Sequence, residues 1–279
     1  FGLCVFYSQA FSYEPDSALF YLNSCTQSWT KATIQEKNAR LKWIPISDST
    51  IHELFLTLAQ KEYAVLLRQP SIDQTEEWLT HFGSIFPNMA TEAILFRDSL
   101  AYEEAVAAQT AAALKLFISS YPEAQQYETA VALYDQLWYQ EQTSNNTELA
   151  LATFILSYPN NPYITQAWSR LYAIYAKEAS ITSFATFIER YPNSPYTPKA
   201  WKQIHQLYLK PYSAEKLAQF KIDYPTYPFL EDLAQDAELL LKKMYPFLQD
   251  DQFGYMDQSG QQVIAPQFDD AGAFVEGLA

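Results

Sequence analysis

The feature that most constrains this chain is a short signature, Phe-x3-[Tyr/Phe]-Pro, that occurs five times. Its phenylalanines are 35, 37, 33 and 33 residues apart along the sequence, and they stand at Phe82, Phe117, Phe154, Phe187 and Phe220. Self-similarity with a period near 34 residues indicates stacked helix pairs, because a single pair cannot bury its apolar face alone. The signature therefore predicts a helical-repeat architecture.

Each part of the signature has a local physical cause. Aromatic residues four apart lie on one face of a helix, and the proline that follows ends this helix because it lacks a backbone N–H and restricts its predecessor. Asn161 and Ser194, each followed by a proline, should then act as N-caps of the next helix. That helix reads Trp168-x2-Leu171-Tyr172-x2-Tyr175 in one copy and Trp201-x2-Ile204-His205-x2-Tyr208 in the next.

These helices resemble the first helix of the tetratricopeptide repeat, W-x2-L-G-x2-Y. The family's glycine is replaced by Asp135, Tyr172 and His205 in three successive copies, so we expect the paired helices to lie farther apart or at another angle. The short second helix ending in Tyr-Pro is similar to the divergent form found in bacterial outer-membrane lipoproteins and assembly factors. The resemblance implies an all-α fold, a right-handed α-solenoid of tetratricopeptide-like helix pairs.

The segments before the repeats suggest a leader and a cap. Residues 1–10 consist of an uncharged apolar run, 1–7, followed by Ser8-Gln9-Ala10, and they resemble the end of a secretory signal peptide cleaved after Ala10. This interpretation implies an exported protein of the periplasm or cell envelope; the alternative is a buried N-terminal strand. Residues 11–70 should form an N-terminal helical cap, in which Asp48-Ser49-Thr50 and Glu53 provide an N-cap and a capping box. Residues 71–247 should hold the repeats.

Composition changes at the C-terminal end, where the last 26 residues contain four of the six glycines. Two runs of β-forming residues are joined by Asp257-x-x-Gly260, which predicts a β-hairpin with Gly260 in the left-handed conformation. Residues 253–279 resemble one unit of the bacterial WG repeat, with Phe253 in place of tryptophan and Met256 in place of isoleucine. We assign residues 248–279 to this unit. Because WG units normally occur in tandem, we expect a longer natural protein.

Composition also argues against several functions. A net charge of −14 disfavours binding to nucleic acid and to anionic membranes. Only two cysteines are present, and none of the three histidines lies in a metal-binding motif, so we expect no metal and no cofactor. No G-x-S-x-G, catalytic cysteine context or phosphate-binding loop occurs in the sequence. The sequence therefore predicts no catalytic residues and a protein that is not an enzyme.

Charge is uneven along the repeats. Residues 190–221 hold six basic residues against a single acidic one, Glu215. On the first helices, the positions expected to face the inside of the solenoid are mostly polar; they are Lys199, Lys202, Gln206 and Lys210 in one copy, and Gln166, Ser169, Ala173 and Lys177 in the copy before it. Such a surface should receive an acidic protein segment or a terminal carboxylate, although it could also be only a solvated helix face.

The resulting hypothesis is a non-enzymatic protein–protein interaction scaffold of the bacterial cell envelope that binds its partner on the concave solenoid face. One alternative is an envelope module that binds glycan or peptidoglycan through exposed aromatic residues. Another is an accessory domain of a larger enzyme. We expect no membrane span in the mature chain.

Overall fold

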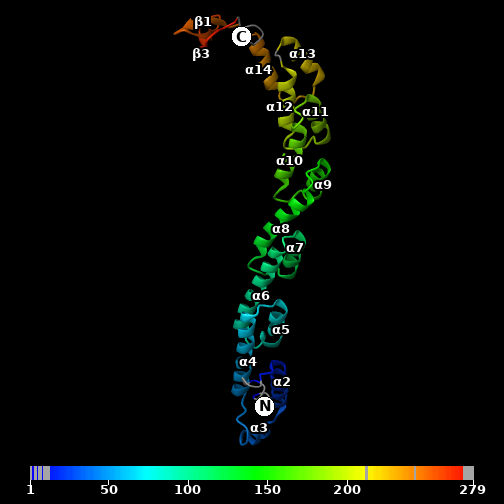
Figure 1. The fold of residues 1–279 in the computed structure, drawn as a ribbon, viewed down its shortest axis with the longest axis vertical. Helices are drawn as coiled ribbons and strands as arrows, with labels where there is room; N and C mark the ends of the chain where they lie inside the picture. Colours follow the sequence, from blue (N-terminus) through cyan, green and yellow to red (C-terminus); the bar gives the residue numbers. More distant parts are fainter. Residues whose placement is uncertain are drawn as a thin grey trace. The chain divides into compact units, whose positions relative to one another are not determined.

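The structure, a computed structural model, describes residues 2, 5, 8, 13–210, 213–241 and 243–272, and this part of the chain is mostly helical (Figure 1). Thirteen helices and a three-stranded sheet are present in it. The helices are α2 (Pro15–Lys31), α3 (Ile34–Leu41), α4 (Asp48–Arg68), α5 (Ile72–Phe82), α6 (Pro87–Ala107), α7 (Ala111–Ser120), α8 (Tyr127–Gln142), α9 (Glu148–Ser157), α10 (Ile164–Ala176), α11 (Ile181–Arg190), α12 (Thr197–Tyr208), α13 (Ala214–Asp223) and α14 (Leu230–Leu241).

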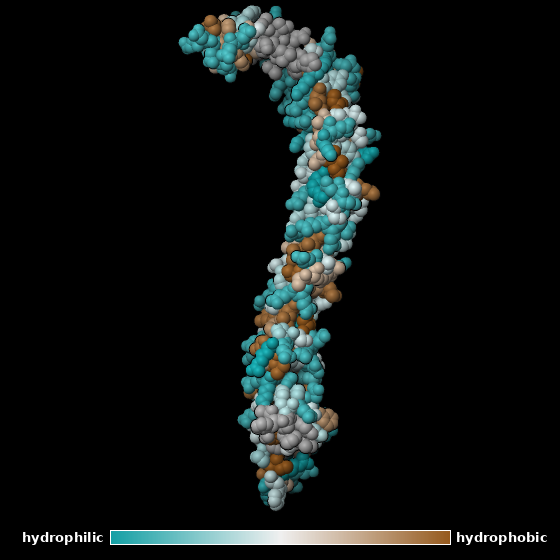
Figure 2. Space-filling view, in the orientation of Figure 1, coloured by the Kyte–Doolittle hydropathy of each residue, from teal (hydrophilic) through white to brown (hydrophobic). Residues whose placement is uncertain are grey.

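The chain divides into two compact units, Phe1–Glu141 and Gln142–Ala279. In each unit, the helices pack mainly against their neighbours in sequence, as in α5 against α6 or α11 against α12. In the first unit, one apolar cluster joins α2, α4, α5 and the start of α6, and a second joins α6, α7 and α8. The surface visible in Figure 2 is largely hydrophilic, with apolar residues in separate patches.

The Phe-x3-Tyr-Pro signature has the same geometry in each of its last four copies. The signature phenylalanine is at most 2% exposed, and its carbonyl accepts the N–H of the tyrosine four residues later at 2.9 Å. That tyrosine is the C-cap, with φ between −131° and −125° and ψ between 57° and 63°. Proline therefore ends each helix immediately after a buried aromatic anchor, as the sequence predicted.

The turn after the proline differs from the prediction. Asn161 and Ser194 are not N-caps, because α10 and α12 begin three residues after them. Asn161 Oδ1 instead accepts the N–H of Tyr163 at 2.9 Å, while its carbonyl accepts the N–H of Ile164 at 3.0 Å. Pro162 thus occupies the second position of a turn, which its fixed φ favours, rather than the first position of the helix.

The signature helices α5, α7, α9, α11 and α13 each begin with a capped turn. A hydroxyl oxygen accepts the backbone N–H three residues on at 3.0–3.3 Å, and the residues that supply it are Ser71, Thr110, Thr147, Ser180 and Ser213. Three of these caps follow directly a non-glycine residue with φ of 50–52°, namely Gln109, Asn146 and Ala179. The left-handed residue ends one helix and the hydroxyl starts the next, which makes the connection short.

The capping box of α4 begins before the segment Asp48-Ser49-Thr50 in which the N-cap was expected. Ser47 is the N-cap, and it pairs with Thr50 through the reciprocal bonds Thr50 N–H to Ser47 Oγ at 3.1 Å and Ser47 N–H to Thr50 Oγ1 at 2.6 Å. The carboxylate of Asp48 is engaged elsewhere, since it accepts the indole N–H of Trp29 at 2.7 Å.

The C-terminal sheet is antiparallel with the order β1-β2-β3, made of β1 (Tyr245–Gln249), β2 (Gln252–Met256) and β3 (Gln262–Phe268). The predicted hairpin β2–β3 is confirmed. Asp257 Oδ1 accepts the N–H groups of Ser259 and Gln261 at 2.8 and 2.9 Å, and Gly260 has φ of +84°.

Strand β1 was not predicted from the sequence. It takes in the last three residues of the range 71–247 that was expected to be helical. Its link to β2 is the pair Asp250-Asp251, with φ of 53° and 61°, a two-residue turn of the kind that matches the twist of a hairpin.

One sequence-based interpretation lies largely, and another in part, outside the described residues. Most of the apolar run 1–10 interpreted as a signal peptide is not described, and neither is the end of the WG-like unit, 273–279. Within the described ranges, none of the helices combines the length and apolarity needed to cross a bilayer.

The left-handed connections predict a stabilising substitution. Ala179 is exposed and holds φ of 50°, so Ala179→Gly should raise the free energy of unfolding by about 0.5–1 kcal/mol because glycine adopts this conformation without steric cost. Ala173→Gly, at an exposed position inside α10, is the matched control and should lower it by about 1 kcal/mol. Chemical denaturation measures both changes. Equal effects of the two substitutions would contradict the assignment.

Substitutions of Gly254 in β2 and of Gly260 in the β2–β3 turn should destabilise the sheet for different reasons. A Cβ at Gly254 would lie 2.6 Å from the carbonyl oxygen of Ile264 and 2.8 Å from the nitrogen of Pro266, whereas the surroundings of Gly260 are open. Gly254→Ala should therefore displace β3 and remove the hydrogen-exchange protection of the β2–β3 pairing. Gly260→Val should cost about 1–2 kcal/mol through its positive φ alone. Exchange in the helices should stay unchanged in both variants.

Candidate functional site

Helices α10 and α12 occupy equivalent places in successive repeats and each has a buried and an exposed face. Ala167 and Leu171 in α10, and Ala200 and Ile204 in α12, are fully buried. The predicted site residues all lie on the exposed faces or directly after these helices; they are Gln166, Ser169, Ala173 and Lys177 in the first copy, and Lys199, Lys202, Gln206 and Lys210 in the second. The separation of faces expected from helical periodicity is present.

Two of the predicted lysines are held over aromatic rings. Lys199 Nζ lies 5.3 Å from the centre of the Tyr172 ring, which stacks on Tyr196 with centroids 5.1 Å apart. Lys202 Nζ lies 4.9 Å from the centre of the Phe229 ring. Each ammonium is thereby attracted to a ring face while its side chain remains exposed. These contacts connect α12 to α10 on one side and to the segment before α14 on the other.

The remaining predicted residues are not gathered into this contact. Lys177 and Ala173 line a separate open groove with Asn146, Arg170 and Ile174. The guanidinium of Arg170 is tied down there, since it donates to Asn146 Oδ1 at 2.9 Å and to Thr143 Oγ1 at 2.8 Å. The predicted surface thus consists of a lysine and aromatic part on α12 and a groove beside α10.

Sequence reasoning missed the aromatic partners of the lysines. Tyr172 occupies the place of the repeat family's glycine, and it is 6% exposed with its ring between Phe184 and Tyr196. A large ring at a position where the family needs the smallest residue was the signal available in the sequence. His205 stands at the same place one copy later. Its ring stacks on Tyr227 with centroids 5.3 Å apart, and its Nε2 lies 2.7 Å from Asp236 Oδ2.

The tryptophans near the N-terminal ends of α10 and α12 lie at the edge of the core. Trp168 and Trp201 are half-buried, Trp168 edge-on to Tyr191 at 6.0 Å, and Trp201 edge-on to Tyr224 at 5.9 Å and to Tyr227 at 6.0 Å. Both make fewer contacts than a fully enclosed ring would. Trp78 in the first unit, by contrast, is buried.

A polar cluster centred on the carboxylate of Glu148 joins three helices of the second unit. Glu148 Oε1, at the start of α9, accepts hydrogen bonds from Tyr175 Oη at 2.7 Å, Arg190 Nη1 at 2.8 Å and Tyr191 Oη at 2.9 Å. Burial alone would raise the pKa of Glu148, but the hydrogen bonds from these three groups outweigh it and hold the pKa below its ordinary value. Burial, followed by the bond to Glu148, raises the pKa of Tyr191. The cluster is a polar link between the α9 and α11 ends.

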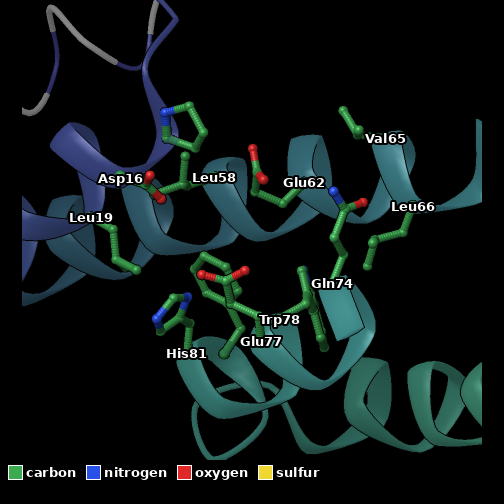
Figure 3. A pocket seen from close by; sticks show the side chains of 12 residues that line it. Asp16, Leu19, Leu58, Glu62, Val65, Leu66, Gln74, Glu77, Trp78 and His81 are labelled. Atoms are coloured by element: carbon green, nitrogen blue, oxygen red, sulfur yellow. The ribbon is translucent and has the colours of Figure 1, made fainter. Parts of the chain in front are cut away.

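The first unit contains a small pocket of about 130 Å³ between α2, α4 and α5 (Figure 3). Its floor is apolar, with Leu19, Leu58 and Trp78 facing one another, and the carboxylates of Glu62 and Glu77 lie around it. Glu62 is already engaged, since it accepts the hydroxyl of Tyr13. Across the described residues, no group of three or more His, Cys, Asp and Glu side chains is placed to hold a metal ion.

Comparison with known families bears on the C-terminal end. Residues 253–279 match the family model described as "WG containing repeat". This agrees with the resemblance of that segment to the WG repeat. The described part of the segment ends at residue 272 and contains most of β2 and all of β3. No curated protein matches the sequence.

The Glu148 cluster predicts a pH-dependent stability. A carboxyl whose folded pKa is lowered stabilises the fold when it is ionised, and this contribution is lost as pH falls below the ordinary value of 4.5 and through the folded pKa. Glu148→Gln should lower the free energy of unfolding at neutral pH by about 1 kcal/mol, a modest value because the side chain is 32% exposed to screening water.

The difference between the wild-type protein and Glu148→Gln should shrink as the solution is acidified. Denaturation measured at a series of pH values from neutral to below 4.5 gives this difference directly. Tyr175→Phe, which removes only one of the three donors, should show a smaller difference with the same trend. A constant difference at every pH would rule out the ionised carboxylate as its source.

Proposed function

We propose that this protein is a non-enzymatic scaffold of the bacterial cell envelope whose helix pairs form a tetratricopeptide-like solenoid and bind a protein segment on the exposed face of the first helices. The observation that carries the proposal is the pair of lysines on α12. Lys199 and Lys202 project from an exposed face and are each held over an aromatic ring, while the opposite face of the same helix is buried. A basic surface with restrained side chains is suited to binding a partner rather than to catalysing a reaction.

Repetition of local geometry supports the solenoid. The signature turns, the hydroxyl caps and the buried phenylalanines recur with nearly the same distances, and the helices pack in sequence order within each unit. A helix pair of this kind presents one helix toward a ligand and uses the other to pack. The resemblance to the tetratricopeptide repeat provides the rest of the argument and is an argument by analogy.

The chemistry of the surface favours an acidic partner. Between residues 190 and 221 the sequence has six basic residues and Glu215 as its single acidic one, in a chain of net charge −14. An acidic segment or a terminal carboxylate would be attracted to this surface and repelled by most other parts of the protein. This difference would fix the place on the protein where the ligand binds. Lysines already placed over rings lose less side-chain freedom when they bind.

Location in the envelope is a separate part of the proposal. It rests on the apolar run 1–10 and on the kind of repeat that the chain resembles. Cell fractionation followed by N-terminal sequencing of the mature protein tests it. Recovery of an uncleaved protein from the cytoplasm would remove the envelope assignment and leave the binding surface untouched.

Charge reversal on α12 should weaken binding to an acidic peptide. Lys199→Glu/Lys202→Glu should lower the affinity for a deca-glutamate peptide by about tenfold or more and should reduce the salt dependence of that affinity. Lys115→Glu/Lys243→Glu makes the same change in net charge at exposed sites elsewhere and is the matched control. Fluorescence anisotropy at several salt concentrations measures both, and equal losses would show that only total charge matters.

Fold and binding can be separated with a third variant. Trp201→Ala should cost about 2–3 kcal/mol of stability, less than the 3–5 kcal/mol typical of a fully enclosed ring, because Trp201 is only half-buried. The lysine variants should melt at nearly the wild-type temperature. Retention of the protein by purified peptidoglycan, combined with indifference to the peptide, would instead favour the glycan-binding alternative.

A further inference from the structure

The first unit contains a surface that the proposed function does not use. It comprises residues 31–44, named here the α3 tip: the end of α2, helix α3 and the loop that leads to α4. In Figure 1 it lies at the end of the first unit opposite α7, and Figure 2 shows hydrophobic surface at that end. Its apolar side chains are exposed to an unusual degree, with Trp43 at 86%, Ile34 at 78%, Leu41 at 46% and Ile44 at 44%.

Helix α3 lacks the packing that normally holds a short helix. It has eight residues and none of them is buried. Its N-terminus is fixed by a capping box, in which Glu36 Oε2 accepts the N–H of Thr33 at 2.8 Å and Glu36 N–H donates to Thr33 Oγ1 at 3.3 Å. Helices of this length are marginal without a packed apolar face, so the exposed face of α3 is available for an external partner.

The loop after α3 adds its two apolar residues to the same end. The N–H groups of Trp43 and Ile44 both donate to the carbonyl of Arg40 at 3.0 Å, which fixes them against the last turn of the helix. Two residues on, Ile46 is buried and anchors the loop to the unit. Trp43 is therefore held outward by ordered backbone rather than by a free chain end. Ile34 and Leu41, seven residues apart, share one helix face.

The charge of the α3 tip is opposite to that of the chain. Four basic residues, Lys31, Lys37, Arg40 and Lys42, stand against the single acidic Glu36, which gives 4 − 1 = +3 in a protein of net charge −14. Lys37 Nζ lies 5.0 Å from the centre of the buried Trp29 ring, and the nearby Asp48 of α4 is engaged by the indole N–H of Trp29. Charges farther than about 10 Å are largely screened in salt, so the local balance decides the interaction.

We propose that the α3 tip is an interfacial membrane-binding element that inserts Trp43, Ile34, Leu41 and Ile44 among the headgroups of an anionic lipid surface, with its basic residues on the phosphates. Exposed tryptophan beside aliphatic residues and rimmed by lysine and arginine is the composition that suits the boundary between water and lipid. The element would lie on the membrane and not cross it. The overall negative charge disfavours an approach of the acidic parts of the protein to such a surface.

Vesicle sedimentation of the full chain tests the proposal. The protein should sediment with vesicles of phosphatidylcholine mixed with phosphatidylglycerol, and not with vesicles of phosphatidylcholine alone. Binding should weaken as salt increases. Trp43→Ala, and separately Arg40→Glu/Lys42→Glu, should each lower the vesicle affinity by about tenfold or more. Both variants should melt as the wild-type protein does, since neither changes a buried residue.

Two controls distinguish this surface from general stickiness and from the binding face of α12. Leu156→Ala removes an apolar side chain that is 81% exposed on α9, and Lys199→Glu/Lys202→Glu makes the same charge change on α12. Both should leave vesicle binding unchanged. No sedimentation with the anionic vesicles at low salt, equal binding to both kinds of vesicle, or an equal loss in the control variants would each overturn the proposal. The result is independent of whether α12 binds an acidic peptide.

Discussion

The helical part of this protein depends on how each signature helix is made to stop. The phenylalanine of the signature is buried between helices, its carbonyl accepts the N–H of the tyrosine four residues later at 2.9 Å, and the following proline prevents a further turn. An ordered turn and the next helix then begin at a fixed distance. If the proline were absent, the helix could extend and the next helix would start with its apolar face in another direction. Burial of one ring and termination of one helix are thus coupled in each of the last four copies, whereas the proline of the first copy, Pro87, begins α6 directly.

The same coupling explains where polar groups are placed. Helix termini leave backbone groups without partners inside the helix, and these repeats satisfy them with a hydroxyl at each signature helix and with a side chain in the turn before α10 and before α12. Larger polar clusters connect helices in place of apolar contacts. Glu148 links α9, α10 and the end of α11, and Arg170 binds the turn that contains Thr143. These links leave the outer faces of α10 and α12 free for other roles.

Aromatic rings have different structural roles in different parts of the chain. In the repeats they fill the space between helices and serve as platforms for exposed lysines, as Tyr172 does for Lys199. In the α3 tip the ring of Trp43 is exposed instead, beside basic residues and in the loop after a helix that has no buried residue. The two proposed surfaces therefore share a composition of lysine and aromatic residues. They differ in whether the ring is held inside the protein or offered to the solvent.

Local physics made part of this structure readable from the sequence alone. Phenylalanine, tyrosine and proline at fixed spacing determine helix ends, Asp257 and Gly260 determine the hairpin turn, and helical periodicity places Lys199 and Lys202 opposite Ile204, because each depends on residues only a few positions apart. Tertiary structure decided the rest. Strand β1 forms because β2 offers it a partner, and the carboxylate of Asp48 at the start of α4 is bound by Trp29, nineteen residues away. The aromatic partners of the lysines come from other helices, and the exposure of Trp43 depends on which surfaces its neighbours leave uncovered. These depend on contacts between segments distant in the sequence, which no local pattern specifies.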